Sequence, residues 1–151
     1  MISSVDRSMP DKVVSNRKIK GLMSGDELVG IDYRPKDGKL YAVGLQANLY
    51  TLNPNNGEAT FPRKLIADPS DTTDGNASFT QIMGDANLIT VNFNPAADRL
   101  RVISNTGQNL RINVDTGATI TDGTINLATG TAAVVAGAYT NAFAGTGSTK
   151  L

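Results

Sequence analysis

The sequence predicts an all-β fold of antiparallel β-repeats, arranged as propeller-like blades in an incomplete ring. One observation behind this prediction is a gapless internal match between residues 28–57 and residues 88–117. Another is the succession of short segments, each alternating apolar and polar residues or rich in β-branched and aromatic ones, between Gly, Asn, Asp and Pro turns. A third is that no segment carries a convincing helical stripe of apolar residues.

The internal match keeps one register from Leu28 opposite Leu88 to Gly57 opposite Gly117, a constant spacing of 60 residues. Self-similarity at a fixed period is the sequence signature of a repeat architecture. We therefore interpret residues 1–151 as a single β-repeat domain containing two aligned units.

A partial third unit is expected over residues 135–151. There Tyr139 would match Phe93, and residues 150–151 would match residues 99–100 after an insertion. Residues 3–6 resemble the end of a strand, so both ends of the chain read as interrupted blades. Open sheet edges of this kind favour self-association or pairing with a protein partner.

Each unit reads as three short strands joined by turns. In the first unit the strands are expected at residues 28–33, 39–44 and 48–54, and in the second at 88–93, 99–104 and 109–114. A fourth strand is expected between the units, and residues 63–79 read as a long loop. Residues 118–140 are expected to add strands, although residues 130–137 could also form a short helix on propensity alone.

Composition excludes several classes of function. The chain has no Cys and no His, so thiol chemistry, disulfides, His–metal sites and Ser-His-Asp hydrolysis are ruled out. Its 14 basic and 14 acidic residues give no electrostatic case for nucleic acid. No apolar run is long enough to span a membrane. The one basic run, at Lys12, Arg17, Lys18 and Lys20, reads as a solvated loop or an edge strand.

Three motifs carry a family resemblance: "GIDYRP…GKLYAVG", "DRLRVISNTGQNLRINVDTG" and "AYTN…TKL". From about Lys20 to Leu151 the chain resembles a bacterial domain family of unknown function. The resemblance implies a propeller-like β-repeat fold and a secreted or periplasmic location. It brings no catalytic residues, and the chain departs from it in lacking an export signal and the family's C-terminal portion.

Three arginines, Arg99, Arg101 and Arg111, stand inside the most strand-like segment of the chain. Because alternate residues of a strand share a face, these side chains are expected to cluster. They could bind a carboxylate, sulfate or phosphate through their guanidinium groups. Alternatively, they form the framework by pairing with Asp98, Asp115 or an acid of another blade, which is the interpretation we favour.

The acidic segment "DPSDTTDGN" offers the oxygen ligands Asp68, Asp71 and Asp74, which suggest Ca²⁺. Their spacing does not match an EF-hand loop, so a flexible acidic loop is the simpler interpretation. No cofactor other than a possible Ca²⁺ is expected.

Three functions remain open at this point. The first is a non-enzymatic exported β-repeat module for protein–protein or surface interaction, which the repeat and the lack of His and Cys favour. The second is a ligand-binding or enzymatic propeller whose site needs further blades. The third is a Ca²⁺-stabilised extracellular module.

Overall fold

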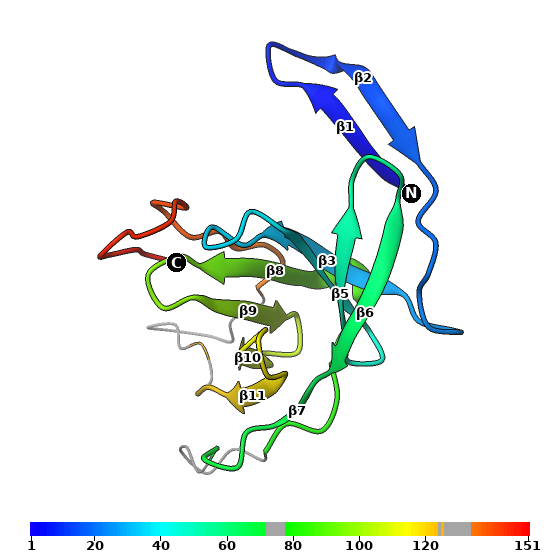
Figure 1. The fold of residues 1–151 in the computed structure, drawn as a ribbon. Helices are drawn as coiled ribbons and strands as arrows, with labels where there is room; N and C mark the ends of the chain where they lie inside the picture. The colour runs from blue at the N-terminus through cyan, green and yellow to red at the C-terminus, as the bar shows by residue number, and fades with distance from the viewer. Residues whose placement is uncertain (72–77, 124, 126–133) are drawn as a thin grey trace.

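The computed structural model describes residues 1–71, 78–123, 125 and 134–151 (Figure 1). Within these residues, the strands form a two-stranded hairpin, a four-stranded sheet in the order β3-β4-β5-β6, and a five-stranded sheet in the order β7-β11-β10-β9-β8. All neighbouring strands are antiparallel except β7 and β11, which pair in parallel. The prediction of an all-β fold with antiparallel sheets is confirmed.

The elements are β1 (Ile2–Asp6), β2 (Met9–Arg17), β3 (Leu28–Tyr33), β4 (Leu40–Gly44), β5 (Asn48–Asn53), β6 (Glu58–Lys64), β7 (Ile66–Ala67), the short 3-10 helix η1 (Ala86–Leu88), β8 (Ile89–Asn94), β9 (Arg99–Ser104), β10 (Asn109–Ile112) and β11 (Ala118–Thr121).

The two aligned units pair their residues in the same register. Leu40 on β4 stands opposite Leu52 on β5, and Leu100 on β9 stands opposite Ile112 on β10. Both units close on a glycine with positive φ, at Gly57 (φ 73°) and Gly117 (φ 80°), a conformation that glycine adopts without a steric penalty. Each amide donates to the carbonyl four residues earlier, at 2.8 Å and 2.7 Å.

The predicted long loop at residues 63–79 is wrong at its start. β6 continues to Lys64, and β7 follows at residues 66–67. The reason is that Arg63 pairs with Leu49 and Ile66 pairs with Ala118, so this segment joins one sheet to the other. β6 is the fourth strand of the first unit, and β11 is the corresponding strand of the second.

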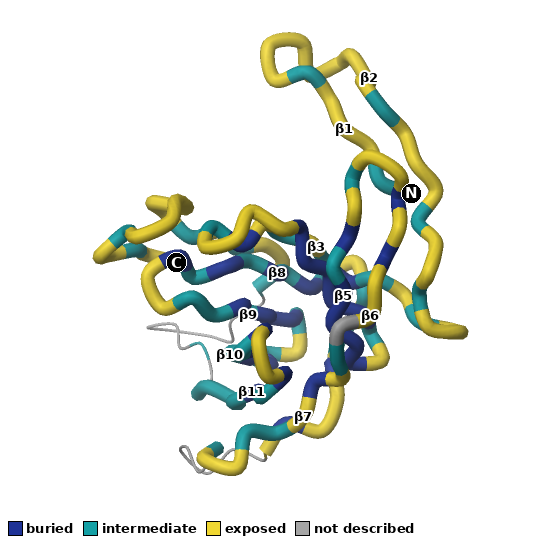
Figure 2. Tube along the Cα trace, in the orientation of Figure 1, coloured by how far each residue is buried: buried dark blue, intermediate teal, exposed yellow. Residues whose placement is uncertain are grey.

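The main core lies between the two sheets (Figure 2). One face of the second unit packs against the first unit, and we call it the front face. It carries Val91, Phe93, Leu100 and Val102. The first unit contributes its opposite, back face, with Tyr41, Val43 and Leu49. Packing front face against back face buries apolar side chains on both sheets and joins the units into one body.

A smaller apolar cluster covers the front face of the first unit. It contains Leu40, Ala42 and Tyr50, and the partly buried Ile2, Ile19 and Leu22 pack against it. The hairpin β1–β2 projects beyond this cluster, and most of its length is exposed (Figures 1 and 2). Residues 3–6, which were predicted to end a strand, form the last four residues of β1, and β1 pairs along its length with β2.

The basic run begins on the exposed strand β2, with Lys12 and Arg17, as expected of an edge strand. Of the strands expected over residues 118–140, β11 provides the first. Residues 126–133, and with them much of the alternative helix at 130–137, lie outside the described residues. Among the described residues, no helix has the length and apolar character needed to cross a lipid bilayer.

Candidate functional site

The first strands of the two units, β3 and β8, lie side by side (Figure 1). Asp32 on β3 accepts a hydrogen bond from the backbone amide of Phe93 at 2.7 Å and from the side-chain amide of Asn92 at 3.0 Å. Burial raises the pKa of Asp32, and the hydrogen bond from the Phe93 amide opposes that shift. Beside it, a Cβ on Gly30 would lie only 2.4 Å from Cγ2 of Val91, so this close approach requires glycine.

The same contact recurs one unit later, between β8 and residues 137–140. Asn92, which matches Asp32 in the repeat, accepts a hydrogen bond from the backbone amide of Tyr139 at 2.7 Å. Thr90, which matches Gly30, donates its hydroxyl hydrogen to the carbonyl of Gly137 at 3.0 Å. Residues 137–140 therefore lie against the second unit as β8 lies against the first.

The side chains above these contacts also correspond. At the first junction Tyr41 meets Phe93 edge to face, with ring centroids 5.4 Å apart and planes inclined at 69°. At the second junction Arg101, which matches Tyr41, donates from Nε to the hydroxyl of Tyr139 at 3.2 Å. Arg101 thus fills a place that an aromatic residue fills at the first junction.

The predicted arginine cluster is held by an acid of its own unit. Arg101 donates to Asn109 at 2.8 Å and makes a short ion pair with Asp122, and Arg111 contacts Asp122 at 2.9 Å. Burial acts against the charge of Arg101, but its bonds to Tyr139 and Asp122 outweigh that effect and raise its pKa. These contacts connect Arg101 to β10, to Asp122 and to residues 137–140.

Arg99 and Arg111 flank a small hollow of about 130 Å³, and Asp68 lies at the same hollow. The fold thus brings together residues from the predicted anion site and from the predicted calcium site. Arg99 donates to the carbonyl of Asp98 at 3.0 Å. Among the described residues, the Nε atom of Arg111 is buried and makes no hydrogen bond.

The partners expected for the arginine cluster belong instead to Arg34. Arg34 is 4% exposed and reaches from the first unit to the second. It binds both carboxylate oxygens of Asp98, at 2.7 Å and 2.6 Å, and both of Asp115, each at 2.7 Å. The expectation that Asp98 and Asp115 pair with the arginines of their own unit is therefore wrong, because Arg34 lies closer to both.

Hydrogen bonding to Arg34 lowers the pKa of Asp98 and that of Asp115, and these two bonds in turn raise the pKa of Arg34. Sequence reasoning missed Arg34. The available signal was its position at the start of the turn 34–38, with Asp98 and Asp115 standing in turns of the second unit.

The acidic loop is described only in part. Asp68 accepts hydrogen bonds from the amide and hydroxyl of Ser70, at 2.9 Å and 2.7 Å. Asp71 accepts a hydrogen bond from the amide of Thr121 at 3.0 Å. Asp74 lies outside the described residues. Across the part of the chain that the structure describes, no three acidic side chains gather in the way that a metal ion requires.

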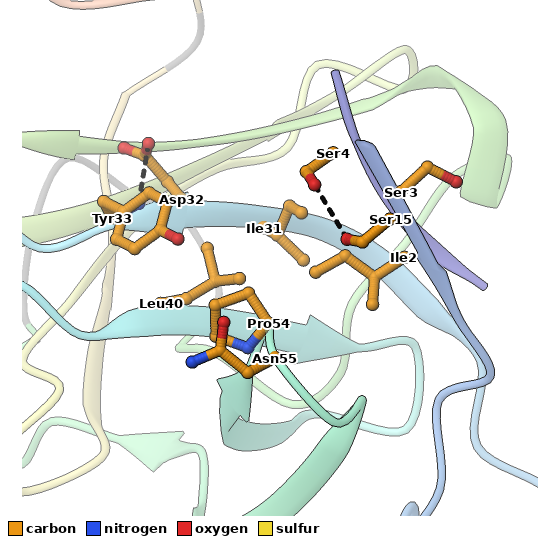
Figure 3. A pocket seen from close by; sticks show the side chains of 10 residues that line it. All are labelled: Ile2, Ser3, Ser4, Ser15, Ile31, Asp32, Tyr33, Leu40, Pro54 and Asn55. Atoms are coloured by element: carbon orange, nitrogen blue, oxygen red, sulfur yellow. Dashed lines mark hydrogen bonds between the residues drawn. The ribbon is translucent and has the colours of Figure 1, made fainter. Parts of the chain in front are cut away.

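The front face of the first unit is partly open. Ile31 is 45% exposed and Tyr33 is 53% exposed, whereas their counterparts Val91 and Phe93 are 8% and 1% exposed. A groove of about 430 Å³ runs between this face and the hairpin (Figure 3). Its lining includes Ile2, Ser4 and Ser15 from the hairpin and Ile31, Tyr33, Leu40 and Pro54 from the first unit.

The model of a family described as a domain of unknown function, DUF4394, matches residues 1–151. The chain belongs to this family. The predicted resemblance to a domain family of unknown function is therefore confirmed, and the match also includes the hairpin that precedes Lys20. No curated protein and no solved structure matches the chain.

The groove offers this DUF4394 domain contacts of two kinds. Ile31, Leu40 and Pro54 provide apolar surface, and Ser4 and Ser15, which hydrogen-bond to each other at 2.7 Å, provide hydroxyl groups. Asp32 also reaches the lining, but its carboxylate is held by Phe93. The groove therefore offers both apolar and hydrogen-bonding contacts to an extended segment.

Proposed function

We propose that this chain is a non-enzymatic, exported β-repeat module that acts by binding a protein surface. In this proposal the two units are neighbouring blades of a propeller-like ring. The inner strands β3 and β8 lie side by side, and each unit continues outwards as a meander of four strands. Export rests on the sequence resemblance.

The observation that carries the proposal is the difference between equivalent residues of the two units. Val91 and Phe93 are buried because the back face of the first unit covers them. Ile31 and Tyr33 occupy the same positions of the repeat and remain exposed beside a groove. An exposed apolar surface with a buried counterpart in the same fold is suited to protein association.

The charged clusters support a structural role over catalysis. Arg34 is held by Asp98 and Asp115, and Arg101 is held by Asp122 and Tyr139. Each of these side chains joins one segment of the fold to another. Together with the lack of His and Cys in the sequence, this favours a binding module over an enzyme.

Site-specific photo-cross-linking tests the proposal. A benzophenone amino acid replaces Tyr33 in the groove, and in a matched variant it replaces Ile66, which is 57% exposed and lies outside the groove. Irradiation in the producing cells is expected to yield a discrete protein adduct from position 33 and none from position 66. The absence of any adduct from position 33 would contradict the proposed function.

A further inference from the structure

The hairpin β1–β2 has the features of the outer half of a repeat unit, by which we mean its third and fourth strands. In both complete units the turn between these strands begins with an Asn that accepts a hydrogen bond from the amide two residues later. The hairpin has the same turn at Asp6. The three bonds run from Ser8 to Asp6 at 2.8 Å, from Asn55 to Asn53 at 2.9 Å, and from Asp115 to Asn113 at 3.0 Å.

The chain leaves β2 as it leaves β6. Residues 17–19 read Arg-Lys-Ile at the end of β2, and residues 63–65 read Arg-Lys-Leu at the end of β6. The amide of Lys20 then donates to the carbonyl of Gly57, and the amide of Ile66 donates to the carbonyl of Gly117, both at 3.0 Å.

Both glycines are also approached in the same way. A Cβ on Gly57 would lie 2.3 Å from the carbonyl oxygen of Lys18, and a Cβ on Gly117 would lie 2.6 Å from that of Lys64. The hairpin therefore contacts the first unit in the same way that β5 and β6 contact the second unit.

The inner half that should complete this outer half does not lie beside the hairpin. In the first unit β5 pairs with β6 on one side and with β4 on the other. Among the described residues, β1 pairs only with β2, so its inner edge is open. The groove of about 430 Å³ lies between β1 and β3, where the first two strands of a unit would fit (Figure 3).

At the other end of the described fold, residues 137–151 make contacts that correspond to those of an inner half. Residues 137–140 lie against β8 through Asn92 and Thr90, as β8 lies against β3. The amide of Thr140 donates to the carbonyl of Lys150 at 2.9 Å, the bond that Arg34 makes with Lys39 at 2.9 Å in the first unit. No strand is assigned within residues 137–151, but these contacts place the segment where the first strand of a further unit and the start of a second would lie.

We propose that residues 137–151 of a second copy of this chain occupy the groove between β1 and β3. The two halves would then form one complete unit shared between two chains. This inference rests on the proposed function and names the partner of the groove. Within one copy the hairpin contacts the first unit, the first unit contacts the second, and the second unit contacts residues 137–140. The hairpin and residues 137–151 therefore stand at opposite ends of the copy.

The shared unit would pair the open strand edge of one copy and bury its exposed apolar side chains. The open edge of β1 gains backbone hydrogen bonds from an added strand, the interaction that edge strands commonly make with a peptide. Tyr33 and Ile31 are covered, as Phe93 and Val91 are. Because the contact is head to tail, repetition gives a closed ring if the rotation closes and a filament if it does not.

The register predicts one close pair of residues across the two copies. Leu40 faces Leu52, and Leu100 faces Ile112. Val5 precedes the turn residue Asp6 as Leu52 precedes Asn53, so Val5 is equivalent to Leu52. Leu151 follows Lys150 as Leu100 follows Arg99, so Leu151 is equivalent to Leu100. Val5 of one copy should therefore face Leu151 of the next, at a spacing that a disulfide can bridge.

The test uses the absence of native cysteine. Val5→Cys and Leu151→Cys chains are mixed in equal amounts under mild oxidation, and Val13→Cys replaces Val5→Cys in the control. Val5 and Val13 are similarly exposed, at 52% and 58%, and lie opposite each other in the hairpin, but only β1 has the open inner edge. A mixed disulfide is expected with Val5→Cys, at a yield about tenfold above that of the control.

Equal yields of mixed disulfide from the two positions, or no mixed disulfide, would overturn the inference. The proposed function is tested separately by the cross-link at Tyr33. An adduct between position 33 and a different protein, without the Val5–Leu151 disulfide, overturns the second copy as the partner and leaves the binding module standing. No adduct and no disulfide would overturn both.

Discussion

Arg34 and Asp98 join the two units through a bidentate ion pair. Nε and Nη2 of Arg34 lie 2.7 Å and 2.6 Å from the two carboxylate oxygens of Asp98. Asp115 binds the same guanidinium through both of its oxygens, and Tyr41 lies beneath it with its ring centre 5.9 Å away. A buried guanidinium with two carboxylates fixes how one unit is oriented on the other.

Replacing Arg34 should therefore destabilise the whole fold. Arg34→Ala is expected to lower the free energy of unfolding by about 2–3 kcal/mol, since it removes charge-assisted hydrogen bonds to Asp98 and Asp115, whose carboxylates remain partly solvated. Lys36→Ala is the control, because the Lys36 side chain is 63% exposed and its ion pair with Asp98 should contribute about 1 kcal/mol or less. Urea unfolding measures both, and similar losses from the two variants would contradict the junction role.

The same junction predicts acid sensitivity. Hydrogen bonding to Arg34 lowers the pKa of Asp98 and Asp115 in the folded state. A lowered carboxyl pKa contributes stability above the unfolded value of about 3.9, and this contribution is lost as the pH falls through the folded pKa. Unfolding free energies measured from pH 7 to pH 2 should decline below about pH 4. Arg34→Ala should flatten that decline, and an unchanged slope would count against this explanation.

Arg101 should hold residues 137–140 in place. Arg101→Ala is expected to raise hydrogen exchange of the Tyr139 amide about tenfold, because it removes a charged partner of the Tyr139 hydroxyl. Arg101→Tyr should retain most of the protection, since Tyr41 fills the equivalent place at the first junction. Arg99→Ala serves as the control and should leave the Tyr139 amide unaffected. Equal protection in all three variants would rule out this role for Arg101.

Substitutions of Asp32 distinguish the effect of its hydrogen bond with the Phe93 amide from the effect of its negative charge. Asp32→Asn keeps an oxygen that can accept from the Phe93 amide and matches Asn92 at the second junction. Burial raises the pKa of Asp32, so the ionised carboxylate costs stability above its folded pKa and Asp32→Asn should stabilise the fold at pH 7. Asp32→Ala should cost about 1–2 kcal/mol by leaving the amide unpaired. Thermal unfolding compares the three proteins, and a loss of stability in Asp32→Asn would refute the assignment.

The hollow beside Arg99 and Arg111 is tested by a thermal unfolding scan. We expect EDTA, Ca²⁺, sulfate and phosphate to leave the midpoint within about 1 °C, as a framework without a bound ion requires. A shift of several degrees by sulfate or phosphate that Arg111→Ala removes would instead establish an anion site. A shift by Ca²⁺ that Asp68→Ala removes would establish the calcium site.

The strands were predictable because their signals are local. Alternation places Ile31 and Tyr33 on one face, and the repeated Gly57 and Gly117 mark where both units turn. β6 was harder to locate, because Pro62 and three charged residues interrupt its apolar pattern, at Glu58, Arg63 and Lys64. Its pairing with β5, and not its own sequence, determines that it is a strand.

The site was harder to predict because its contacts are long-range. Arg34 stands in a turn that reads as solvated, and its partners Asp98 and Asp115 come from a different unit. The hairpin lacks the closing glycine of the complete units, and the match of residues 17–19 to residues 63–65 is short, so its likeness to an outer half rests mainly on the bonds of Asp6 and Lys20. Sequence periodicity locates strands, but it does not identify which half of a unit they represent.

The mass of the chain in solution tests the central claim most directly, namely that the open groove binds another copy. Light scattering coupled to size-exclusion chromatography would follow the unmodified chain, Val5→Lys and Val13→Lys over a hundredfold range of concentration. We predict a mass above the single-chain value of 15.9 kDa that rises with concentration, is abolished in Val5→Lys and persists in Val13→Lys. A single-chain mass for the unmodified protein at every concentration would contradict the account.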